Sequence, residues 1–496
     1  MSQYLLAIDQ GTSSSRAIVF THTGVPMGQC QIDLSLYYPK EGWVEQDPEE
    51  MWTNILQCIH QVLSDLRLKA KDIAVVGITN QRETTIIWDK NTGQPIYRAI
   101  VWQDRRTSEI CKQLEQHPIN ISLKEKTGLL LDPYFSASKI LWLLNNIPNA
   151  REQAERGELL FGTVDTFLLW RLTKGKVHAT DATNASRTLL FNIQTQQWDD
   201  EILHAFNIPA TLLPTVLDSS ADFGVIDKEY FNHSIPIGSM IGDQQAATVG
   251  QACFERGMVK STYGTGGFLF LNTGEKTVSS THKLLSTVAY RIKGKVTYGL
   301  EGSIFSAGAT IKWLRDKLQL IKTASETSEL AQSIHDTGGV YLIPGFTGLG
   351  APYWDSNARG ALLGLTSNSG VEQIVRAALE SVAYQTRDLL TAMASDMQEQ
   401  VTTLRVDGGM TANTWLLQFL ADILNLEIQK PACIETTALG AAYLAGLQIG
   451  TYHSLSDISN LWQANQSFFP QMLSDQRQRL CHGWEQAIAK VVNKME

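Results

Sequence analysis

The chain has 496 residues, of which 43% are hydrophobic and 18% are charged, and its formal net charge is −9. This composition is typical of a folded globular protein, and the length predicts two domains rather than one. The sequence has no run of lysine or arginine. Together with the negative charge, this argues against nucleic acid or an anionic membrane surface as the main partner.

The cysteines and the N-terminal residues bear on the cellular compartment. Six cysteines are scattered without a C-x-x-C pair, which supports neither a zinc site nor a disulfide framework. From Tyr4 the chain enters a short apolar run that Asp9 interrupts, so no signal peptide is visible. No apolar stretch reaches the ~20 residues needed to cross a bilayer. We therefore expect a cytoplasmic protein without a membrane span.

Residues 4–20 predict a tight β-hairpin whose tip carries one carboxylate, one glycine, four hydroxyl groups and one arginine. Gly11 allows backbone N–H groups to turn toward an anion, and Arg16 can neutralise its charge. Asp9 can hold a cation. The same pattern also fits an ordinary polar hairpin, so both interpretations stay open at this point.

The next segments predict an α/β layer. A helix begins after Asp47, with a proline at its first position and Glu50 in the capping-box position. Residues 73–78 predict a buried strand, residues 84–88 its hairpin partner and residues 99–102 a further strand. Polar loops follow these strands, where functional side chains commonly lie.

The second half of the chain opens as the first half does. Residues 107–215 predict helical insertions, and residues 236–250 predict a strand that leads into a small-residue helix. An apolar run, a glycine-threonine tip and another apolar run follow over residues 258–271. We therefore expect two domains, residues 1–250 and residues 251–496.

Glycine turns of this kind occur three times, with Asp243 between the first and the second. Residues 403–413 predict a strand, a double-glycine turn and the start of a helix, and residues 438–446 predict a helix suited to close packing against another backbone. The three turns are at residues 9–12, 264–266 and 407–409. Because they are spread over both halves, they predict a nucleotide held between two domains.

Several longer blocks carry a specific resemblance: residues 7–16, 77–84, 102–106, 242–247 and 262–266. With the three glycine turns, they resemble the phosphate and adenosine loops of the actin, Hsp70 and sugar-kinase superfamily. Over essentially its whole length the chain resembles the FGGY carbohydrate kinases, whose signature regions match residues 134–146 and 360–365, and among them the members that phosphorylate glycerol.

The resemblance implies both a fold and an activity. The expected fold is α/β, with two related actin-like ATPase domains of the ribonuclease H-like type and a nucleotide cleft between them. The expected reaction transfers the γ-phosphate of ATP to a terminal hydroxyl of glycerol, giving sn-glycerol 3-phosphate and ADP. Phosphoryl transfer to an alcohol requires metal-bound ATP, an aligned hydroxyl and a carboxylate that accepts its proton.

Asp243 is the candidate general base. Its usual pKa of about 3.9 makes it a carboxylate at neutral pH, so we expect the proton to move late in the reaction. The alternative is that Asp243 only caps the following helix, because Gly-Asp before a small-residue helix is also an N-cap pattern.

A small polyol requires paired hydrogen-bond donors and acceptors beside an aromatic wall. By resemblance, the residues that bind the hydroxyl groups and the carbon chain are Arg82, Glu83, Trp102, Tyr134, Asp243, Gln244 and Phe268. Without the resemblance, Arg82 and Glu83 would be interpreted as a surface ion pair worth at most ~1 kcal/mol, and Trp102 as a core residue.

The resemblance also implies that ATP and Mg²⁺ bind. Mg²⁺ keeps several waters and usually takes only one or two carboxylates, and the candidates here are Asp9 and Asp243. The candidates for the phosphate and nucleoside contacts are Thr12, Ser13, Ser14, Arg16, Thr265, Gly308, Lys312, Gly409 and Asn413. Lys312 departs from well-known members, which have glutamine at this position, so the adenine contact stays open.

A second departure concerns regulation. Some family members bind fructose 1,6-bisphosphate through a glycine-arginine loop that precedes the block at residues 242–247. This chain has Tyr-Phe-Asn-His-Ser at residues 230–234 instead, so two donors for a sugar phosphate are missing and we expect weak or no inhibition. The resemblance further implies a homodimer or a homotetramer.

Two other functions stay open. An FGGY kinase for another polyol or a ketose such as xylulose is one, although the pairing of residues 82–83 with residues 243–244 disfavours it. An ATP-driven binding or assembly protein of the actin or Hsp70 type is the other. Nothing after the nucleotide-binding segments resembles a peptide-binding domain, which disfavours that function.

Overall fold

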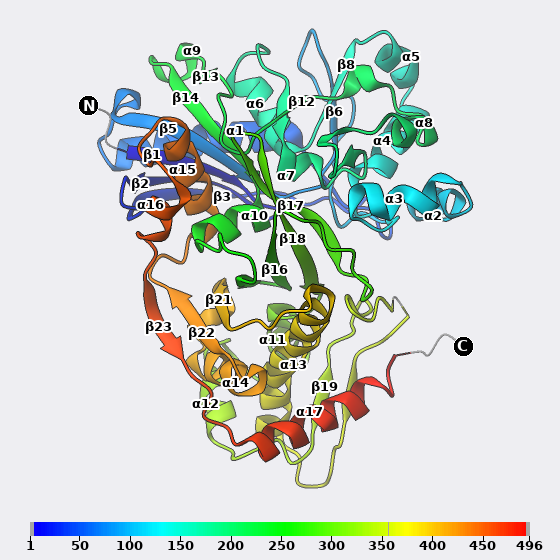
Figure 1. The fold of residues 1–496 in the computed structure, drawn as a ribbon, viewed down its shortest axis with the longest axis vertical. Coiled ribbons are helices and arrows are strands. Elements are labelled where there is room, and N and C mark those ends of the chain that lie inside the picture. Colours follow the sequence, from blue (N-terminus) through cyan, green and yellow to red (C-terminus); the bar gives the residue numbers. More distant parts are fainter. Residues whose placement is uncertain (1–3, 356, 493–496) are drawn as a thin grey trace.

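The computed structural model describes residues 4–355 and 357–492. Two lobes lie one above the other, each built around a mixed β-sheet (Figure 1). The first sheet has the order β13-β14-β5-β1-β2-β3. Its strands are β1 (Tyr4–Gln10), β2 (Ser14–Thr21), β3 (Pro26–Asp33), β5 (Ile73–Asn80), β13 (Val225–Ile226) and β14 (Ile235–Gly242).

The first hairpin is confirmed. Strands β1 and β2 pair antiparallel, with Gln10 opposite Ser15, and the residues between them form its polar tip. Strand β5 pairs parallel with both β1 and β14. All three strands are almost completely buried, which explains why each reads as a continuous apolar run rather than as an alternating pattern.

The second sheet has the order β17-β18-β16-β15-β21-β22-β23. The second predicted glycine tip joins β15 to β16, and these two strands pair antiparallel as the first hairpin does. The strands are β15 (Val259–Tyr263), β16 (Gly267–Gly274), β17 (Leu285–Ile292), β18 (Lys295–Ile304), β21 (Thr403–Asp407), β22 (Glu427–Pro431) and β23 (Ala464–Phe468).

Short strand pairs lie outside the two large sheets, and one of them corrects a prediction. Residues 84–88 do not form a hairpin with β5, because both edges of β5 are occupied by β1 and β14. Strand β6 pairs with β8 instead. The short strands are β4 (Glu45–Gln46), β6 (Ile86–Asp89), β7 (Ala99–Ile100), β8 (Leu159–Gly162), β9 (Ala179–Asp181), β10 (Phe191–Asn192), β11 (Gln197–Trp198), β12 (Thr215–Leu217), β19 (Tyr341–Ile343) and β20 (Ala361–Leu363).

Helix α1 (Pro48–Asp65) packs on β2 and β3 and contributes to the core of the first lobe. Asp47 is its N-cap, as predicted, and its carboxylate accepts the backbone N–H of Glu49 at 2.9 Å. Glu50 does not complete a capping box. Its carboxylate accepts the backbone N–H and the hydroxyl of Ser35 instead, because that loop offers two donors at once.

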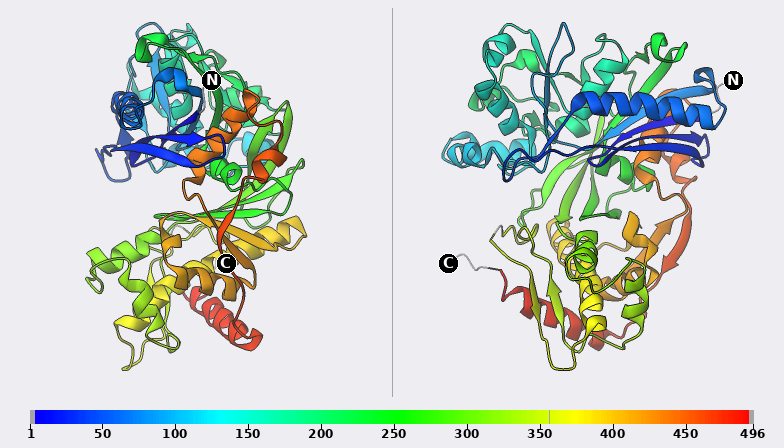
Figure 2. Two further views of the ribbon diagram at one scale, coloured as in Figure 1. Left: turned by 90° about the vertical axis from the view of Figure 1, so that its left-hand side faces the viewer. Right: turned by 180° about the vertical axis from the view of Figure 1, so that it is seen from behind.

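The other helices of the first lobe are mostly insertions between strands. They are α2 (Ser108–Glu115), α3 (Ile119–Thr127), α4 (Ser136–Asn146), α5 (Ala150–Glu155), α6 (Val164–Leu172), α7 (Ala182–Ala185), α8 (Asp200–Ala205), α9 (Lys228–Phe231) and α10 (Asp243–Gly250). Of these helices, α2 to α5, in cyan and teal, gather on one side of the upper lobe (Figure 1), as the view from behind also shows (Figure 2).

The long helix α13 packs against β16 and β18 and forms the centre of the second lobe. The helices of the second half are α11 (Gly308–Asp316), α12 (Glu326–Gln332), α13 (Val371–Met397), α14 (Thr414–Leu424), α15 (Thr436–Gln448), α16 (Leu455–Ser459) and α17 (Ser474–Ile488). Within residues 4–355 and 357–492, no helix is long and apolar enough to span a bilayer.

The predicted close packing of a small-residue helix is confirmed for α15. A Cβ atom on Gly440 would lie 1.9 Å from the carbonyl oxygen of Ala246, and one on Gly250 would lie 1.9 Å from that of Thr436. Only glycine therefore permits α10 and α15 to approach this closely. Although α15 comes from the second half of the chain, it lies on β1, β5 and β14 of the first sheet (Figure 1).

Candidate active site

The parallel strands of the first sheet bring the predicted acidic and basic residues to one edge. Gln10, Asn80 and Gly242 occupy corresponding register positions at the ends of β1, β5 and β14. Asp9 therefore lies at the same edge as Asp243, which directly follows β14. Ligands of α/β sheets commonly bind at the carboxyl ends of parallel strands.

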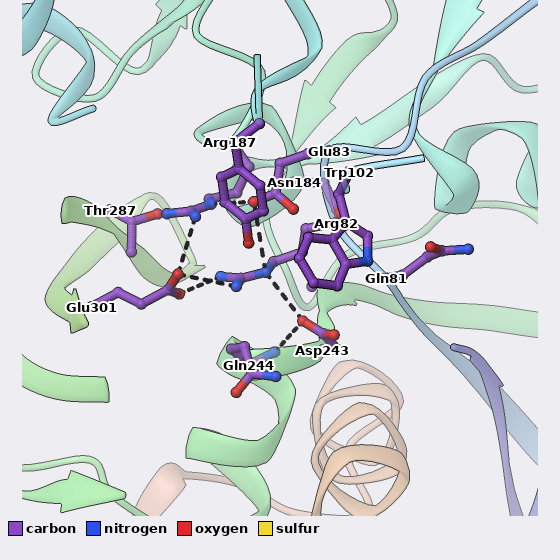
Figure 3. A network of polar contacts seen from close by, with 12 residues as sticks. Gln81, Arg82, Glu83, Trp102, Asn184, Arg187, Asp243, Gln244, Thr287 and Glu301 are labelled. Carbon is purple, nitrogen blue, oxygen red and sulfur yellow. Dashed lines mark hydrogen bonds and ion pairs between the residues drawn. The ribbon is translucent and has the colours of Figure 1, made fainter. Parts of the chain in front are cut away.

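Arg82 is the centre of a buried polar network (Figure 3). Its Nε lies 3.1 Å from Oδ1 of Asp243. On the other side of the guanidinium, Nη1 and Nη2 donate to the two carboxylate oxygens of Glu301 at 2.5 and 3.1 Å. The side chain of Arg82 is only 2% exposed, so it is not the surface residue that its neighbourhood in the sequence suggested.

Arg187 forms the second cation of this network. Its Nε donates to Glu83 at 2.6 Å and its Nη2 to Glu301 at 3.0 Å. Burial disfavours a charged Glu301, but the guanidinium groups of Arg187 and Arg82 outweigh this effect and lower its pKa to about 2. Glu301 therefore remains ionised and holds both arginines from the second lobe.

Asp243 is the first residue of α10, and Gly242 is the N-cap. The Asp243 carboxylate accepts the N–H of Gln244 at 2.7 Å, whereas an N-cap side chain accepts from two or three positions further on. Its side chain is 31% exposed. Burial raises the pKa of Asp243 to about 6, with Arg82 opposing and Glu83 adding to the rise. The geometry is that of an accessible carboxylate beside one guanidinium.

Gln244 contacts a residue that the sequence did not single out. Its amide oxygen Oε1 accepts a hydrogen bond from Nζ of Lys260 at 2.6 Å. Lys260 also donates to the hydroxyl of Thr262 at 3.1 Å and is fully buried on β15. The contact joins the first helix turn of α10 to the second sheet.

Aromatic side chains flank this network. Trp102 and Tyr134 pack edge to face, with ring centroids 5.6 Å apart, and the indole Nε1 of Trp102 donates to the Thr12 hydroxyl at 2.9 Å. Phe268 lies on β16, directly opposite Thr262 and Ser303. Directly paired residues share a face of a sheet, so Phe268 projects from the same face as Thr262.

Asp9 and Arg16 of the first hairpin form an ion pair with each other. Arg16 also donates through Nη1 to Glu435 at 2.7 Å, the residue before α15. Asp9 and Glu435 raise the pKa of Arg16. At the tip itself, Thr12 and Ser14 are partly exposed and Ser13 is exposed. These tip residues are therefore accessible, although the Thr12 hydroxyl accepts from Trp102, and the arginine is held from both sides.

The second and third glycine turns lie against each other. The N–H of Gly308, at the start of α11, donates to the carbonyl of Gly264 at 3.0 Å. A Cβ on Gly308 would lie 2.6 Å from that carbonyl oxygen. Gly408 has φ 89°, and a Cβ there would lie 2.5 Å from the carbonyl oxygen of Tyr263. These two glycines are thus required by the crossing of the backbones.

The remaining nucleotide candidates differ in their surroundings. A Cβ on Gly409 would meet no atom within 4 Å, so this position is open. Thr265 uses its carbonyl to accept two N–H groups at the start of α11, and Lys312 is exposed on that helix. Asn413 is the N-cap of α14, accepting the N–H of Leu416 at 3.1 Å.

A chain of contacts connects the first and third glycine turns. Glu435 bonds Arg16 of the first hairpin, and the next residue, Thr436, donates to Asp407 of the third turn at 2.8 Å. Asp407 also accepts from Gln251, which follows α10, at 2.7 Å. The structure thereby brings the first and third turns and the helix of Asp243 together.

Four residues of this site were missed from the sequence: Arg187, Lys260, Glu301 and Glu435. Arg187 and Glu301 lie in segments with no charge pattern around them, and Lys260 interrupts an otherwise ordinary strand. The described residues also line two hollows of about 250 and 220 Å³, beside Trp415 and beside Tyr452. Neither hollow is lined by a predicted site residue.

Together, the two lobes, the glycine turns that meet between them and the carboxylate at the strand edge define a two-domain kinase with the actin-like ATPase fold. Family models for the N-terminal and C-terminal domains of the FGGY family of carbohydrate kinases match residues 4–250 and 259–449. The chain belongs to the FGGY family of carbohydrate kinases.

The chain is similar over nearly its full length to named relatives. It is 58% identical to a glycerol kinase of Coxiella burnetii, with 99% of this chain and 98% of the relative covered. It is 56% identical to a glycerol kinase of Ectopseudomonas mendocina, with 99% of each chain covered. The crystal structure of the Plasmodium falciparum glycerol kinase with ADP superposes with a TM-score of 0.93, at 39% identity and 99% coverage of both chains.

Proposed function

We propose that this chain is an ATP-dependent kinase that phosphorylates a terminal hydroxyl of glycerol, giving sn-glycerol 3-phosphate and ADP. The observation that carries the proposal is the pairing of Asp243 with Arg82. A partly exposed carboxylate lies beside a buried guanidinium that Glu301 fixes from the other lobe. The identity to the glycerol kinases, which extends over the whole length, supports glycerol as the acceptor.

Asp243 acts as the general base in this proposal. A carboxylate whose pKa is raised to about 6 is still ionised at neutral pH, and it is a better proton acceptor than one with an unperturbed pKa. It accepts the proton of the attacking hydroxyl as that oxygen bonds to the γ-phosphorus and the bond to the β-phosphate oxygen breaks. Arg82 keeps the carboxylate oriented.

The other residues predicted to contact the substrate bind the polyol. The carboxylate of Glu83 can accept a hydrogen bond from a hydroxyl group, and the amide of Gln244 can donate one. Tyr134 adds a phenol whose pKa is raised by burial, so it stays protonated and can donate a hydrogen bond. Trp102 and Phe268 provide apolar surface for the carbon chain. Small neutral polyols are distinguished by such paired contacts, because each unpaired polar group would cost binding energy.

The residues of the three turns fit a nucleotide and a divalent cation. The accessible tip residues Thr12, Ser13 and Ser14, together with Thr265 and the guanidinium of Arg16, would hold the phosphates. The open backbone at Gly409 leaves room for the nucleoside, near Gly308, Lys312 and Asn413. Asp9 and Asp243 are the carboxylates available for Mg²⁺, which, when bound, supplies positive charge to the phosphates.

We also propose that the chain divides functionally at about residue 250. The family models end and begin on either side of this position. The acceptor residues then come mainly from the first domain, whereas Phe268 and the second and third glycine turns come from the second. The two substrates meet where the domains face each other.

An acceptor panel tests the proposal. ADP release is measured with glycerol, dihydroxyacetone, xylulose, ribulose and gluconate, each with and without Mg²⁺, and the product is identified by ³¹P NMR. Glycerol is expected to give the highest kcat/KM. ADP release that needs no added acceptor would contradict a kinase, and a preference for a five-carbon sugar would contradict only the assignment of glycerol.

A further inference from the structure

We propose that Lys260 is a positioning residue for the acceptor, because it fixes which way the carboxamide of Gln244 faces. This inference rests on the proposed function, in which Gln244 binds an acceptor hydroxyl. Lys260 itself is not expected to touch the acceptor. Its effect passes through the hydrogen bond of 2.6 Å between its Nζ and Oε1 of Gln244.

The chemistry of the contact determines the amide orientation. An ammonium group has three donors and no acceptor, so the amide atom that faces it must be the oxygen. The amide nitrogen of Gln244 then points elsewhere with two donors. Among residues 4–355 and 357–492, Nε2 of Gln244 has no protein acceptor, whereas Oε1 has Lys260. A hydroxyl group of the substrate, bound beside Asp243, would accept a hydrogen bond from this nitrogen.

Lys260 is held in turn by the second sheet. Its side chain projects from the same face of β15 as Thr262, to which it donates at 3.1 Å. Asp407 pairs with Thr262 on β21, so its carboxylate lies on this face too. Burial lowers the pKa of Lys260, and the carboxylates of Asp407, Asp243 and Glu301 oppose that effect. Arg82 adds to the lowering, so the three carboxylates offset only part of the effect of burial on Lys260.

The pair also crosses between the lobes. Gln244 is on α10, which follows the first sheet, and Lys260 is on the second sheet. The orientation of the Gln244 amide, which we propose binds the glycerol, thus depends on a residue of the second lobe. The alternative is a purely structural role, in which Lys260 only neutralises buried carboxylates and leaves acceptor affinity unaffected.

Q244E tests the orientation without removing the contact. A glutamate keeps one oxygen toward Lys260 and forms an ion pair with it. Its other oxygen, which faces the glycerol, can only accept hydrogen bonds, whereas the amide nitrogen of glutamine donates them. We expect a folded enzyme with an unchanged or higher melting temperature and a KM for glycerol raised at least ~10-fold. A KM for glycerol within twofold of wild type would overturn the proposal.

K260M and Q244M form a double-mutant cycle. K260M is expected to raise the KM for glycerol ~5-fold and to leave the KM for ATP within twofold, because in this proposal Lys260 affects substrate binding only through the amide of Gln244. Since Lys260 acts through Gln244, the K260M/Q244M variant should have the KM for glycerol of Q244M alone. Independent effects that multiply in the double variant would overturn the proposal.

The controls separate folding and substrate identity from the proposed role. The double variant removes both partners of the hydrogen bond between Lys260 and Gln244, so it is expected to be less destabilised than K260M alone, which leaves the amide oxygen without its donor. K295M, an exposed lysine on β18, controls for the substitution itself. If wild type prefers another acceptor, glycerol is wrong as the substrate. The double-mutant cycle is then repeated with that substrate, and its KM values decide whether Lys260 acts through Gln244.

Discussion

The substitution D243N tests the catalytic role of Asp243. Asparagine retains an oxygen that accepts the N–H of Gln244 and that can stay beside Nε of Arg82, which lies 3.1 Å from the carboxylate of wild type. The local geometry should therefore survive, although the ion pair is lost. The basic group is lost with it, because an amide oxygen does not accept a proton at any pH used for the assay.

The size of the effect follows from the ionisation state. With a pKa of about 6, roughly 99% of Asp243 is ionised at pH 8, so the substitution removes the whole population of base. General-base catalysis contributes about 10²- to 10⁴-fold, and we expect kcat to fall ~10³-fold, which corresponds to ~4 kcal/mol.

The assay follows ADP release at pH 8 with saturating glycerol and Mg-ATP. Calorimetric titration of ADP without Mg²⁺ serves as the binding control, and its affinity should change less than threefold. D316N, an Asp-to-Asn substitution on the exposed end of α11, should behave as wild type. A D243N enzyme that keeps more than a tenth of wild-type kcat would refute the assignment of Asp243 as the base.

Four further predictions follow from the same site. As the pH falls through about 6, the kcat/KM of wild type should decline ~10-fold per pH unit, because protonation removes the base; a profile flat down to pH 5 would contradict this. E301Q should lose ~3–5 kcal/mol in urea unfolding, since Arg82 and Arg187 would remain buried without their counter-ion; a loss under 1 kcal/mol would argue against the network. R16M should raise the KM for ATP at least ~10-fold and leave that for glycerol within twofold, because Arg16 lies beside the hairpin tip that we propose binds the phosphates; equal effects on both would count against that role. Fructose 1,6-bisphosphate at millimolar concentration should not inhibit, because residues 230–234 lack the glycine-arginine pair, and strong inhibition in the ADP assay would refute this.

Much of the fold was predictable from local signals. The hairpin of β1 and β2 follows from two apolar runs around a polar tip, and the start of α1 follows from Asp47 and Pro48. The sequence predicted that α15 packs closely against another backbone, since Gly440 lies in a helix of small residues. The identity of its partner, α10, was not predictable, because it depends on tertiary structure.

The missed features are all long-range. Glu301 meets Arg82 across a sequence separation of 219 residues, and no local pattern marks either as paired. The chain after β5 was expected to form a hairpin, but it turns inward at Glu83, which has φ 61°. Arg82 and Glu83 at this turn belong to the buried polar network, so the strand prediction fails where the candidate site lies.

Helix α15 comes late in the sequence but packs on the first sheet, so this sheet cannot be fully covered until most of the chain has been synthesised. Ala441 and Leu444 of this helix belong to one apolar core cluster with Ala7 of β1, Ile18 of β2 and Val75 of β5. A fragment that ends at residue 250 would leave this surface in water. During synthesis, the N-terminal sheet therefore buries this face only after the chain has been made as far as residue 448, and until then the face is an exposed apolar surface that favours aggregation.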